Sequence, residues 1–478
     1  MVTRARKSKP EPKAATKSAA PPAAKAAKVV KAASKSAAKP AKPKKTRPAK
    51  EKEKEPAAGP GAKPVPESAA EAVPRSTPRP APKAAEAHVS MEPEVAREYS
   101  VRALVLQGGG ALGAYQGGVL QGLSEGGIDI NWVAGISIGA LNAAVIAGNP
   151  PETRVARLRE FWETICQQPW LPSLPHALLA DSAETWPEPV RIWFDAMHAA
   201  RAMFEGQRGF FIPRLWPEVF GRYTDPGRVS FYDTGPLKAT LEAFADFDRI
   251  NDHKAMRVSV GAVNVRTGNF EYFDNTRCTL RPEHFMASGA LPPGFPAIEI
   301  DGEFYWDGGL VSNTPLAEVL AAQPRRDALI FQVDLWSARG HLPHDLSDVA
   351  ERQKDIQYSS RTRAITDVMR EQQNYRRILS QLMQLVPESE RDNHWYKRAQ
   401  EHACDARRNV IQLIYRDKSF ENSAKDYQFG ALTMTEHWSS GLDDIRQTLK
   451  HPQWLAMPGG EHPFVTHDVH RGNGDSKR

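Results

Sequence analysis

Cysteine is scarce in this sequence, and long apolar runs are absent from it. The cysteines are Cys166, Cys278 and Cys404, which are odd in number and far apart. This usage fits a reducing compartment and gives no paired spacing for a disulfide framework or a metal site. No run of about 18 apolar residues occurs, which argues against a membrane-spanning helix. The residues after Met1 are basic and lack a following apolar stretch, so no secretory signal is recognised. We therefore expect a cytoplasmic protein, with peripheral contact to a membrane left open.

The first 98 residues also lack aromatic side chains and consist mostly of Ala, Lys and Pro. Residues 1–50 hold 16 Lys and Arg against 1 Asp or Glu, and residues 51–98 hold 7 against 9. The segment carries +13 and the whole chain +6, so the remaining 380 residues carry −7. Such a composition buries too little apolar surface to offset its ordering entropy, so we expect a disordered tail. A solubilising spacer is one interpretation, and attachment to nucleic acid, anionic lipid or a polyanionic granule is the other.

The folded part begins near Tyr99 and alternates short β-type runs with helical segments. We expect strands over residues 102–107 and 130–136, each followed by a glycine-containing turn and a helix, at 114–123 and 138–147. This alternation is the pattern of a parallel α/β sheet. Further strands are expected over residues 256–265, 270–273, 297–300, 303–306 and 328–335.

Helical sequence fills most of the rest of the chain. Residues 154–250 are predicted to form a mainly helical insert, and residues 345–386 a charged helix. An apolar stripe with three-four spacing runs along that helix. It consists of Ile365, Val368, Tyr375, Leu379, Leu382 and Val386. Packing of the stripe on the core is favoured over a coiled coil, because the repeat lasts only about three heptads.

A glycine-rich loop follows the first strand and admits two interpretations. Gly108, Gly110 and Gly113 keep the spacing of a dinucleotide-binding fingerprint. That site needs an acidic residue at the end of the second strand, about 20 residues further on, whereas Asp129 precedes the second strand. Three consecutive glycines ahead of a helix can also hold an oxyanion with their N–H groups. The position of Asp129 favours the oxyanion interpretation.

The second strand runs into Gly135-Ile136-Ser137-Ile138-Gly139, a G-x-S-x-G pentapeptide. A serine on a sharp strand-to-helix turn exposes its hydroxyl, and glycines flank it because a Cβ there would collide with the neighbouring strand and helix. The pentapeptide is common by chance, so the strand before it and the apolar helix after it carry the interpretation. Ser137 is the predicted nucleophile, with the amides of Gly108, Gly109 and Gly110 as predicted oxyanion donors.

A nucleophilic serine also needs a base. Late histidines are available, but none follows an expected strand; they are His341, His344, His394, His402 and His437. Asp307 in Trp306-Asp307-Gly308-Gly309 directly follows the strand expected over residues 303–306. Two glycines after an aspartate let it lie against another backbone and point into a site, although a plain turn is the alternative for this motif alone.

These motifs together resemble a known family. The glycine loop from Gly108 to Gly113, the Ser137 pentapeptide and Asp307-Gly308-Gly309 are similar in order and spacing to the patatin-like phospholipase family. Residues 287–292, ahead of Phe295-Pro296, are similar to the family's segment upstream of its catalytic aspartate. The similarity covers about residues 101–335. Two later segments, Ile414-Tyr415-Arg416 and Lys425-Asp426-Tyr427, resemble a bacterial subgroup with a helical C-terminal extension.

The resemblance implies a three-layer α/β/α sandwich with a mainly parallel sheet, and hydrolysis of the carboxylic esters of lipids. It implies a dyad without histidine, in which Asp307 accepts the proton of Ser137 and later activates the deacylating water. The glycines implied to support the turns are Gly113, Gly135, Gly139, Gly308 and Gly309. No cofactor and no metal is implied. Family members often carry a basic residue where this chain has Leu112, so phospholipid preference is less secure than esterase chemistry.

These interpretations divide the chain into four parts. We expect a disordered basic tail over residues 1–98 and a catalytic domain over residues 99–335, with the insert at about 154–250. A helical C-terminal extension over residues 336–457 and a flexible tail over residues 458–478 follow. Five tryptophans lie in the insert beside Phe210-Phe211, and packing in the core is favoured over a lid or an interfacial surface; they are Trp162, Trp170, Trp186, Trp193 and Trp216.

Two other functions remain open from the sequence. One is a granule-associated polyester depolymerase that docks through the basic tail. The other is a catalytically silent binding protein that the tail tethers to nucleic acid. The presence of both Ser137 and Asp307 argues against the silent protein, so the expected partner is a lipid ester substrate.

Overall fold

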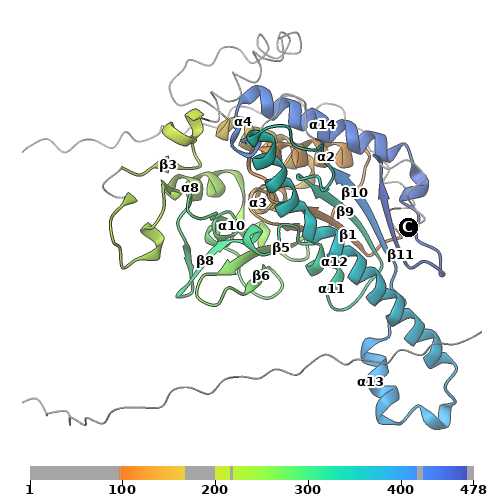
Figure 1. Ribbon diagram of the computed structural model, residues 1–478. Helices are drawn as coiled ribbons and strands as arrows, with labels where there is room; N and C mark the ends of the chain where they lie inside the picture. The colour runs from red at the N-terminus through yellow and green to blue at the C-terminus, as the bar shows by residue number, and fades with distance from the viewer. Residues whose placement is uncertain (1–95, 97, 167–199, 216–218, 417–423, 471–478) are drawn as a thin grey trace, which may run out of the picture. The chain divides into compact units, whose positions relative to one another are not determined.

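The computed structural model describes residue 96 and residues 98–166, 200–215, 219–416 and 424–470 (Figure 1). The strands are β1 (Val101–Leu106), β2 (Trp132–Gly135), β3 (Ile212–Pro213), β4 (Tyr232–Asp233), β5 (Arg257–Asn264), β6 (Phe270–Asp274), β7 (Ile298–Ile300), β8 (Glu303–Asp307), β9 (Ala328–Asp334), β10 (Arg408–Ile414) and β11 (Phe464–Asp468). The α-helices are α2 (Ala114–Glu125), α3 (Ile138–Ala147), α4 (Pro151–Ile165), α8 (Gly235–Phe244), α9 (Phe247–Ile250), α10 (Pro282–Ser288), α11 (Leu316–Ala321), α12 (Leu346–Gln384), α13 (His394–His402) and α14 (Ala431–Leu449). Short 3-10 turns include η1 (Gly110–Gly113), η3 (Gly308–Leu310) and η5 (Lys425–Tyr427).

A nine-stranded sheet forms the centre of the fold. Its order is β11-β10-β9-β1-β2-β5-β8-β7, with β6 also paired to β5. Neighbours from β11 to β5 run parallel, and β6, β7 and β8 add antiparallel pairs at one end. Along β1, Leu104 and Leu106 enter one apolar cluster, while Ala103 and Val105 enter the cluster on the opposite face. Burial on both faces explains why the parallel strands read as unbroken apolar runs.

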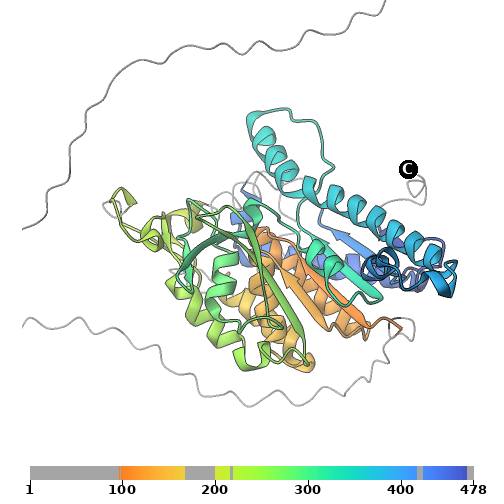
Figure 2. The same ribbon diagram turned by 90° about the horizontal axis from the view of Figure 1, so that it is seen from below.

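Helices cover both faces of the sheet, as expected of a three-layer sandwich. α2, α3 and α14 lie on one face, and α11 and α12 lie on the other (Figure 1, Figure 2). The α/β fold class and the mainly parallel sheet predicted from the sequence are therefore confirmed. Within the described ranges, no helix is both long enough and apolar enough to cross a bilayer.

The C-terminal part contributes strands as well as helices, which corrects the sequence interpretation. β10 pairs with β9 and β11 pairs with β10, both in parallel. The predicted helical extension thus omitted β10, and the predicted flexible tail over residues 458–478 contains β11. The physical reason is burial: Val410 and Ile411 of β10 have no exposed surface, and Phe464 of β11 is packed into the core. The extension completes the sheet on that side.

Close contact between α2 and α14 fixes this C-terminal part to the first half of the chain. Gly118 of α2 faces the backbone of Trp438 on α14, where any Cβ would collide with the Trp438 carbonyl oxygen. Gly441 of α14 approaches the backbone of Tyr115 in the same way. Small residues at both positions allow the two helices to pack at short range, so α14 is an integral layer of the fold.

The apolar stripe of α12 does not pack as predicted. Val368, Tyr375 and Leu382 each expose more than half of their surface. At 39 residues the helix is about 58 Å long, and its second half extends beyond the sheet toward α13 (Figure 1). The prediction of core packing is therefore wrong for these three residues. At the level of Val368 and Tyr375 the helix is packed through a different face, which carries Thr366, Met369 and Gln373.

The described part of the insert is less helical than predicted. α4, α8 and α9 are helical, but β3 and β4 pair in a small antiparallel ribbon. Trp162 is fully buried in the main core, as expected for it. Trp170, Trp186, Trp193 and Trp216 lie outside the described residues.

Candidate active site

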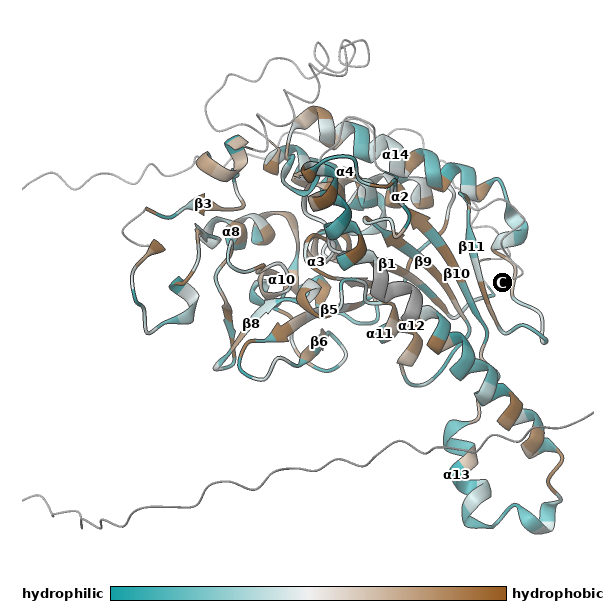
Figure 3. Ribbon diagram, in the orientation of Figure 1, coloured by the Kyte–Doolittle hydropathy of each residue, from teal (hydrophilic) through white to brown (hydrophobic). Residues whose placement is uncertain are grey.

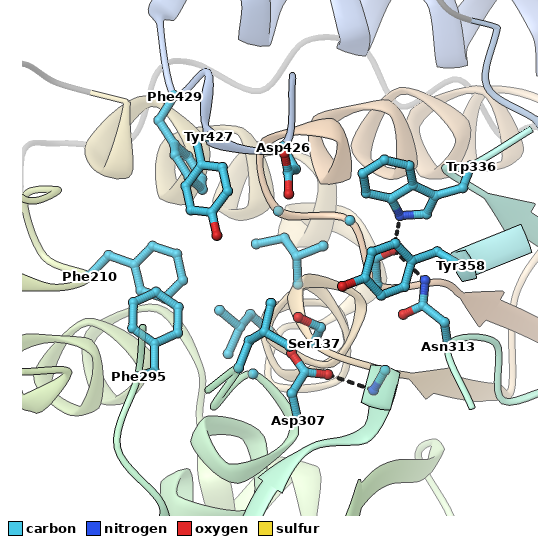
Figure 4. A pocket seen from close by; sticks show the side chains of 18 of the residues that line it. Ser137, Phe210, Phe295, Asp307, Asn313, Trp336, Tyr358, Asp426, Tyr427 and Phe429 are labelled. Carbon is cyan, nitrogen blue, oxygen red and sulfur yellow. Dashed lines mark hydrogen bonds between the residues drawn. The ribbon is translucent and has the colours of Figure 1, made fainter. Parts of the chain in front are cut away.

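The register of β5 brings the two predicted catalytic residues together. Gly135 at the end of β2 pairs with Val260 of β5, and Asp307 at the end of β8 pairs with Ala262 of the same strand. β6 pairs with this stretch of β5 as well, so it occupies one edge. β2 and β8 must therefore share the other edge, end to end. Because their carboxyl ends point toward each other, Ser137 and Asp307 meet there, and Figure 4 shows their side chains side by side.

Ser137 occupies the strained turn that the pentapeptide predicts. Its backbone has φ 54° and ψ −125°, a left-handed conformation that non-glycine residues rarely adopt. A Cβ on Gly135 or Gly139 would collide with neighbouring backbone, so glycine is required on both sides of the turn. Ser137 is the N-cap of α3, which places its side chain where the helix dipole favours negative charge.

A neighbouring hydroxyl supports this turn. The Ser137 N–H donates to Ser288 Oγ at 3.1 Å. Ser288 Oγ donates in turn to the carbonyl oxygen of Gly261 on β5 at 2.7 Å. Ser288 is fully buried at the end of α10. It belongs to the segment that the sequence singled out beside the family motif, but its role was not predicted.

Asp307 is a buried carboxyl group, with only 2% of its surface exposed. Its Oδ1 accepts a hydrogen bond from the Gly309 N–H at 2.7 Å. Burial raises the pKa of Asp307 from 3.8 to about 7, while the Gly309 N–H and the Ser137 hydroxyl act to lower it. A carboxyl group with this proton affinity can exchange a proton near neutral pH, as a general base must.

The glycine loop differs from the prediction in one of its three amides. The Gly108 N–H donates to the Asn313 carbonyl oxygen at 3.2 Å. The Gly108 carbonyl oxygen accepts from Asn313 Nδ2 at 2.9 Å and from Trp336 Nε1 at 2.8 Å. Gly108 is thus held on both sides of its backbone, and the prediction of Gly108 as an oxyanion donor is corrected. The N–H groups of Gly109 and Gly110 have no acceptor among the residues that the structure describes.

The C-terminal part closes the cavity above this loop. Gly110 has φ +56°, and a Cβ there would collide with the carbonyl oxygen of Asp426 in η5. Tyr358 of α12 and Tyr427 of η5 line the same cavity, and Figure 4 shows both hydroxyls pointing into it. From the sequence, Lys425-Asp426-Tyr427 was predicted only as a resemblance to a subgroup. Asn313, Trp336 and Tyr358 were not predicted as site residues.

Crossed ion pairs hold η5 against α12. Lys425 Nζ lies 3.1 Å from Glu351 and 3.0 Å from Asp355, with only 1% of the lysine exposed. In the neighbouring pair the charges are exchanged: Asp426 of η5 carries the negative charge, and Lys354 Nζ of α12 lies 2.8 Å from it. Burial raises the pKa of Asp426, and the Lys354 ammonium opposes that rise. Alternating charges on both elements fix their register and place Asp426 beside Gly110.

Aromatic side chains form the rest of the wall. The rings that line the cavity are Phe210, Phe211, Phe295, Phe429, Trp336, Tyr358 and Tyr427 (Figure 4). Ile138 and Leu141 of α3 and Leu291 add aliphatic surface. Ser137 and Asp307 therefore lie in a cavity whose wall is mainly apolar.

Other sequence candidates lie elsewhere. The late histidines do not line the cavity, and His437 is buried with Nδ1 3.3 Å from the Ala111 carbonyl oxygen. The Asp129 side chain is largely exposed and lies 3.9 Å from Arg154. Leu112 is fully buried in the main core and does not line the cavity.

Two family models match parts of the chain. A family model described as patatin-like phospholipase matches residues 104–320, and one described as patatin phospholipase matches residues 356–461. Among solved structures, the chain is similar to VipD from Legionella pneumophila, with 14% identity and a TM-score of 0.31, over 73% of this chain and 67% of that chain.

Two further solved structures show weaker similarity. Human GIVD cytosolic phospholipase A2 matches with 13% identity and a TM-score of 0.26, over 56% of this chain and 44% of that chain. A chain of the ExoU–SpcU complex from Pseudomonas aeruginosa matches with 17% identity and a TM-score of 0.21, over 56% of this chain and 52% of that chain. These two matches span about half of the other chain's length. A comparison with curated protein sequences gives no match.

Proposed function

Because the chain belongs to the patatin-like phospholipase family and is a lipid ester hydrolase, we propose that Ser137 and Asp307 form its catalytic dyad. The observation that carries this proposal is the end-to-end placement of β2 and β8 on one edge of β5. This placement brings a serine on a strained turn beside a buried carboxyl group, with no histidine among the residues that line the cavity.

Acylation follows from the positions of these groups. Asp307 accepts the Ser137 proton while Ser137 Oγ forms a bond to the carbonyl carbon of the ester. The carbonyl oxygen then carries a negative charge, which the N–H groups of Gly109 and Gly110 stabilise by hydrogen bonding. When the intermediate collapses, the C–O bond to the alcohol breaks and the Asp307 carboxylic acid protonates the leaving oxygen. The products of this step are the free alcohol and an acyl ester on Ser137.

Deacylation uses the same groups in the same order. Asp307, again ionised, accepts a proton from water as the water oxygen attacks the acyl carbon. The same two amides stabilise the second oxyanion. Collapse breaks the bond to Ser137 Oγ, which takes the proton back from Asp307, and a fatty acid is released. No step needs a metal, a cofactor or a second base.

The experiment is fatty-acid release from mixed phospholipid vesicles, with the wild type beside Ser137→Ala. Release by the wild type alone supports the proposal, and equal release by both proteins contradicts it. A soluble short-chain ester is measured in parallel. If the protein hydrolyses that ester but not the vesicles, the proposed chemistry at Ser137 stands, and the substrate is a lipid ester other than phospholipid.

A further inference from the structure

Large apolar side chains are unusually exposed on the described part of the insert. Phe204 exposes 82% of its surface and Leu215 exposes 71%. We name these side chains together the apolar insert surface; its members are Met203, Phe204, Ile212, Leu215, Phe220, Val229 and Phe231. Soluble proteins rarely gather so many exposed apolar side chains in one short segment unless that surface binds something.

This surface is continuous with the wall of the cavity. Directly before β3, Phe211 is buried and lines the cavity, while Ile212, the first residue of the strand, is half exposed. Beside β4, Phe231 is also about half exposed, and the adjacent Tyr232 packs its ring 4.9 Å from the Phe211 ring. Figure 3 shows the apolar colouring at β3. The exposed apolar side chains at β3 and β4 therefore adjoin the cavity wall through Phe211 and the Tyr232 ring that packs on it.

We propose that the apolar insert surface docks the protein onto a lipid aggregate and delivers the ester directly into the aromatic cavity. The inference rests on the proposed function, because a lipid ester must leave its aggregate to reach Ser137. An apolar path from docking surface to cavity lets the acyl chain move without exposure to water. Residues 201–231 also hold five arginines against three acidic residues, so the charge of this segment does not oppose approach to a lipid surface.

The exposed C-terminal end of α12 offers a matched comparison. Leu385 at the end of that helix exposes 79% of its surface, close to the value for Leu215. Leu385 does not line the cavity. If every exposed apolar side chain contacted lipid, both residues would contribute to binding. If only the surface next to the cavity contacts lipid, Leu215 contributes and Leu385 does not.

The test measures binding of full-length protein to vesicles in the Ser137→Ala background, so that no lipid is consumed. Phosphatidylcholine vesicles are used, because the +13 segment at residues 1–98 would draw every variant to anionic lipid. Phe204→Ser and Leu215→Ser are compared with Leu385→Ser by cosedimentation. We expect each insert variant to bind at least about tenfold more weakly, and Leu385→Ser to bind as the parent does. Circular dichroism checks that the variants are folded.

A second readout keeps this proposal separate from the proposed function. With Ser137 present, the ratio of vesicle hydrolysis to soluble-ester hydrolysis should fall about tenfold in the insert variants and stay constant in Leu385→Ser. Unchanged vesicle affinity in Phe204→Ser and Leu215→Ser would overturn the docking surface, as would loss of affinity in Leu385→Ser alone. If the wild type hydrolyses neither substrate while binding still depends on Phe204 and Leu215, the proposed chemistry fails and the docking surface stands.

Discussion

The Ser137 N–H donates to Ser288 Oγ, and through Ser288 the strained turn is tied to the backbone of β5. The same stretch of β5 pairs with Asp307. Both members of the proposed dyad are therefore positioned by one strand, and Ser288 is the side chain that completes the link. A strained backbone persists only where its surroundings hold it in place.

Removal of this link should lower the rate without removing a reacting group. In Ser288→Ala the buried Ser137 N–H loses its acceptor, which costs about 1–3 kcal/mol of stability. Small displacement of the nucleophile should lower kcat by about 10- to 100-fold. The control is Ser312→Ala, whose hydroxyl makes only a 3.5 Å contact near the same cavity. Equal kcat values in the two variants would remove Ser288 from this role.

The two dyad residues should behave as one unit. Ser137→Ala and Asp307→Asn should each lower kcat by on the order of 10⁴-fold, because each removes the same proton transfer and attack. The double variant should be no slower than the worse single variant. Steady-state kinetics on a soluble ester measures all three proteins. If the fold decrease in kcat of the double variant equalled the product of the two single decreases, a shared mechanism would be contradicted.

Activity should rise with pH through the pKa of Asp307. The base must be ionised, and burial raises its pKa to about 7. The value of kcat/KM should therefore fall about tenfold for each pH unit below 7 and level off above it. Asp334 is a matched control, because burial also raises its pKa to about 7 but it does not line the cavity. In Asp334→Asn, kcat/KM should therefore still fall about tenfold for each pH unit below 7.

Stability should change with pH in the opposite direction. A carboxyl group whose folded pKa is above its unfolded value of 3.8 binds its proton more tightly in the folded state. Stability is therefore highest below about pH 4 with respect to this group, and it falls as the pH rises toward 7. At pH 8, Asp307→Asn should stabilise the protein by roughly 2–4 kcal/mol, and at pH 4 this gain should disappear. Thermal unfolding at the two pH values measures the difference.

The loop that carries the proposed oxyanion donors should not tolerate a methyl group at Gly110. In Gly110→Ala the Cβ meets the Asp426 carbonyl oxygen, so either the loop or η5 must move. A displaced donor should lower kcat by on the order of 10²-fold. Gly268 also has a positive φ, +69°, but no atom lies within 4 Å of its Cβ position. Gly268→Ala therefore carries similar backbone strain, and it should leave kcat at the wild-type value.

The buried lysine of η5 should matter for both stability and rate. Lys425→Met leaves the Asp355 carboxylate buried without its lysine partner, which should destabilise the protein by about 3–5 kcal/mol. Release of η5 should also lower kcat, because Asp426 and Tyr427 close the cavity. Lys397→Met removes an exposed pair with Asp392, and it should cost less than about 1 kcal/mol. If the Lys425→Met/Asp355→Leu double variant regains stability, the ion pair and not the volume of Lys425 explains the loss.

The first half of the fold was predictable from local sequence. β1, β2, α2 and α3 lie within a few residues of their expected ranges, because buried parallel strands and apolar helices have strong patterns. The hairpin of β7 and β8 was also found, and its turn residues Asp301 and Gly302 both have positive φ. Ser137 and Asp307 could be proposed from the sequence because each stands at the end of an expected strand, next to glycines.

What the sequence did not predict depends on contacts between distant segments. The use of the Gly108 N–H by Asn313 requires knowledge of a loop that lies 205 residues away. Lys425 is a charged residue in a short 3-10 turn, and only the approach of Glu351 and Asp355 explains its burial. β10 and β11 were missed because short apolar runs between helices resemble helix ends until a sheet edge is known to lie beside them.

The contact of Gly110 with Asp426 has a consequence for synthesis of the protein. Ser137 and Asp307 are both translated more than 100 residues before the segment that closes the cavity. A nascent or cleaved chain that ends before Lys425 carries the whole dyad, but it lacks the η5 wall and the α14 layer. Such a chain has an open site and an incomplete sheet. The cavity is therefore complete only after residues 425–449 have been made, well after both Ser137 and Asp307.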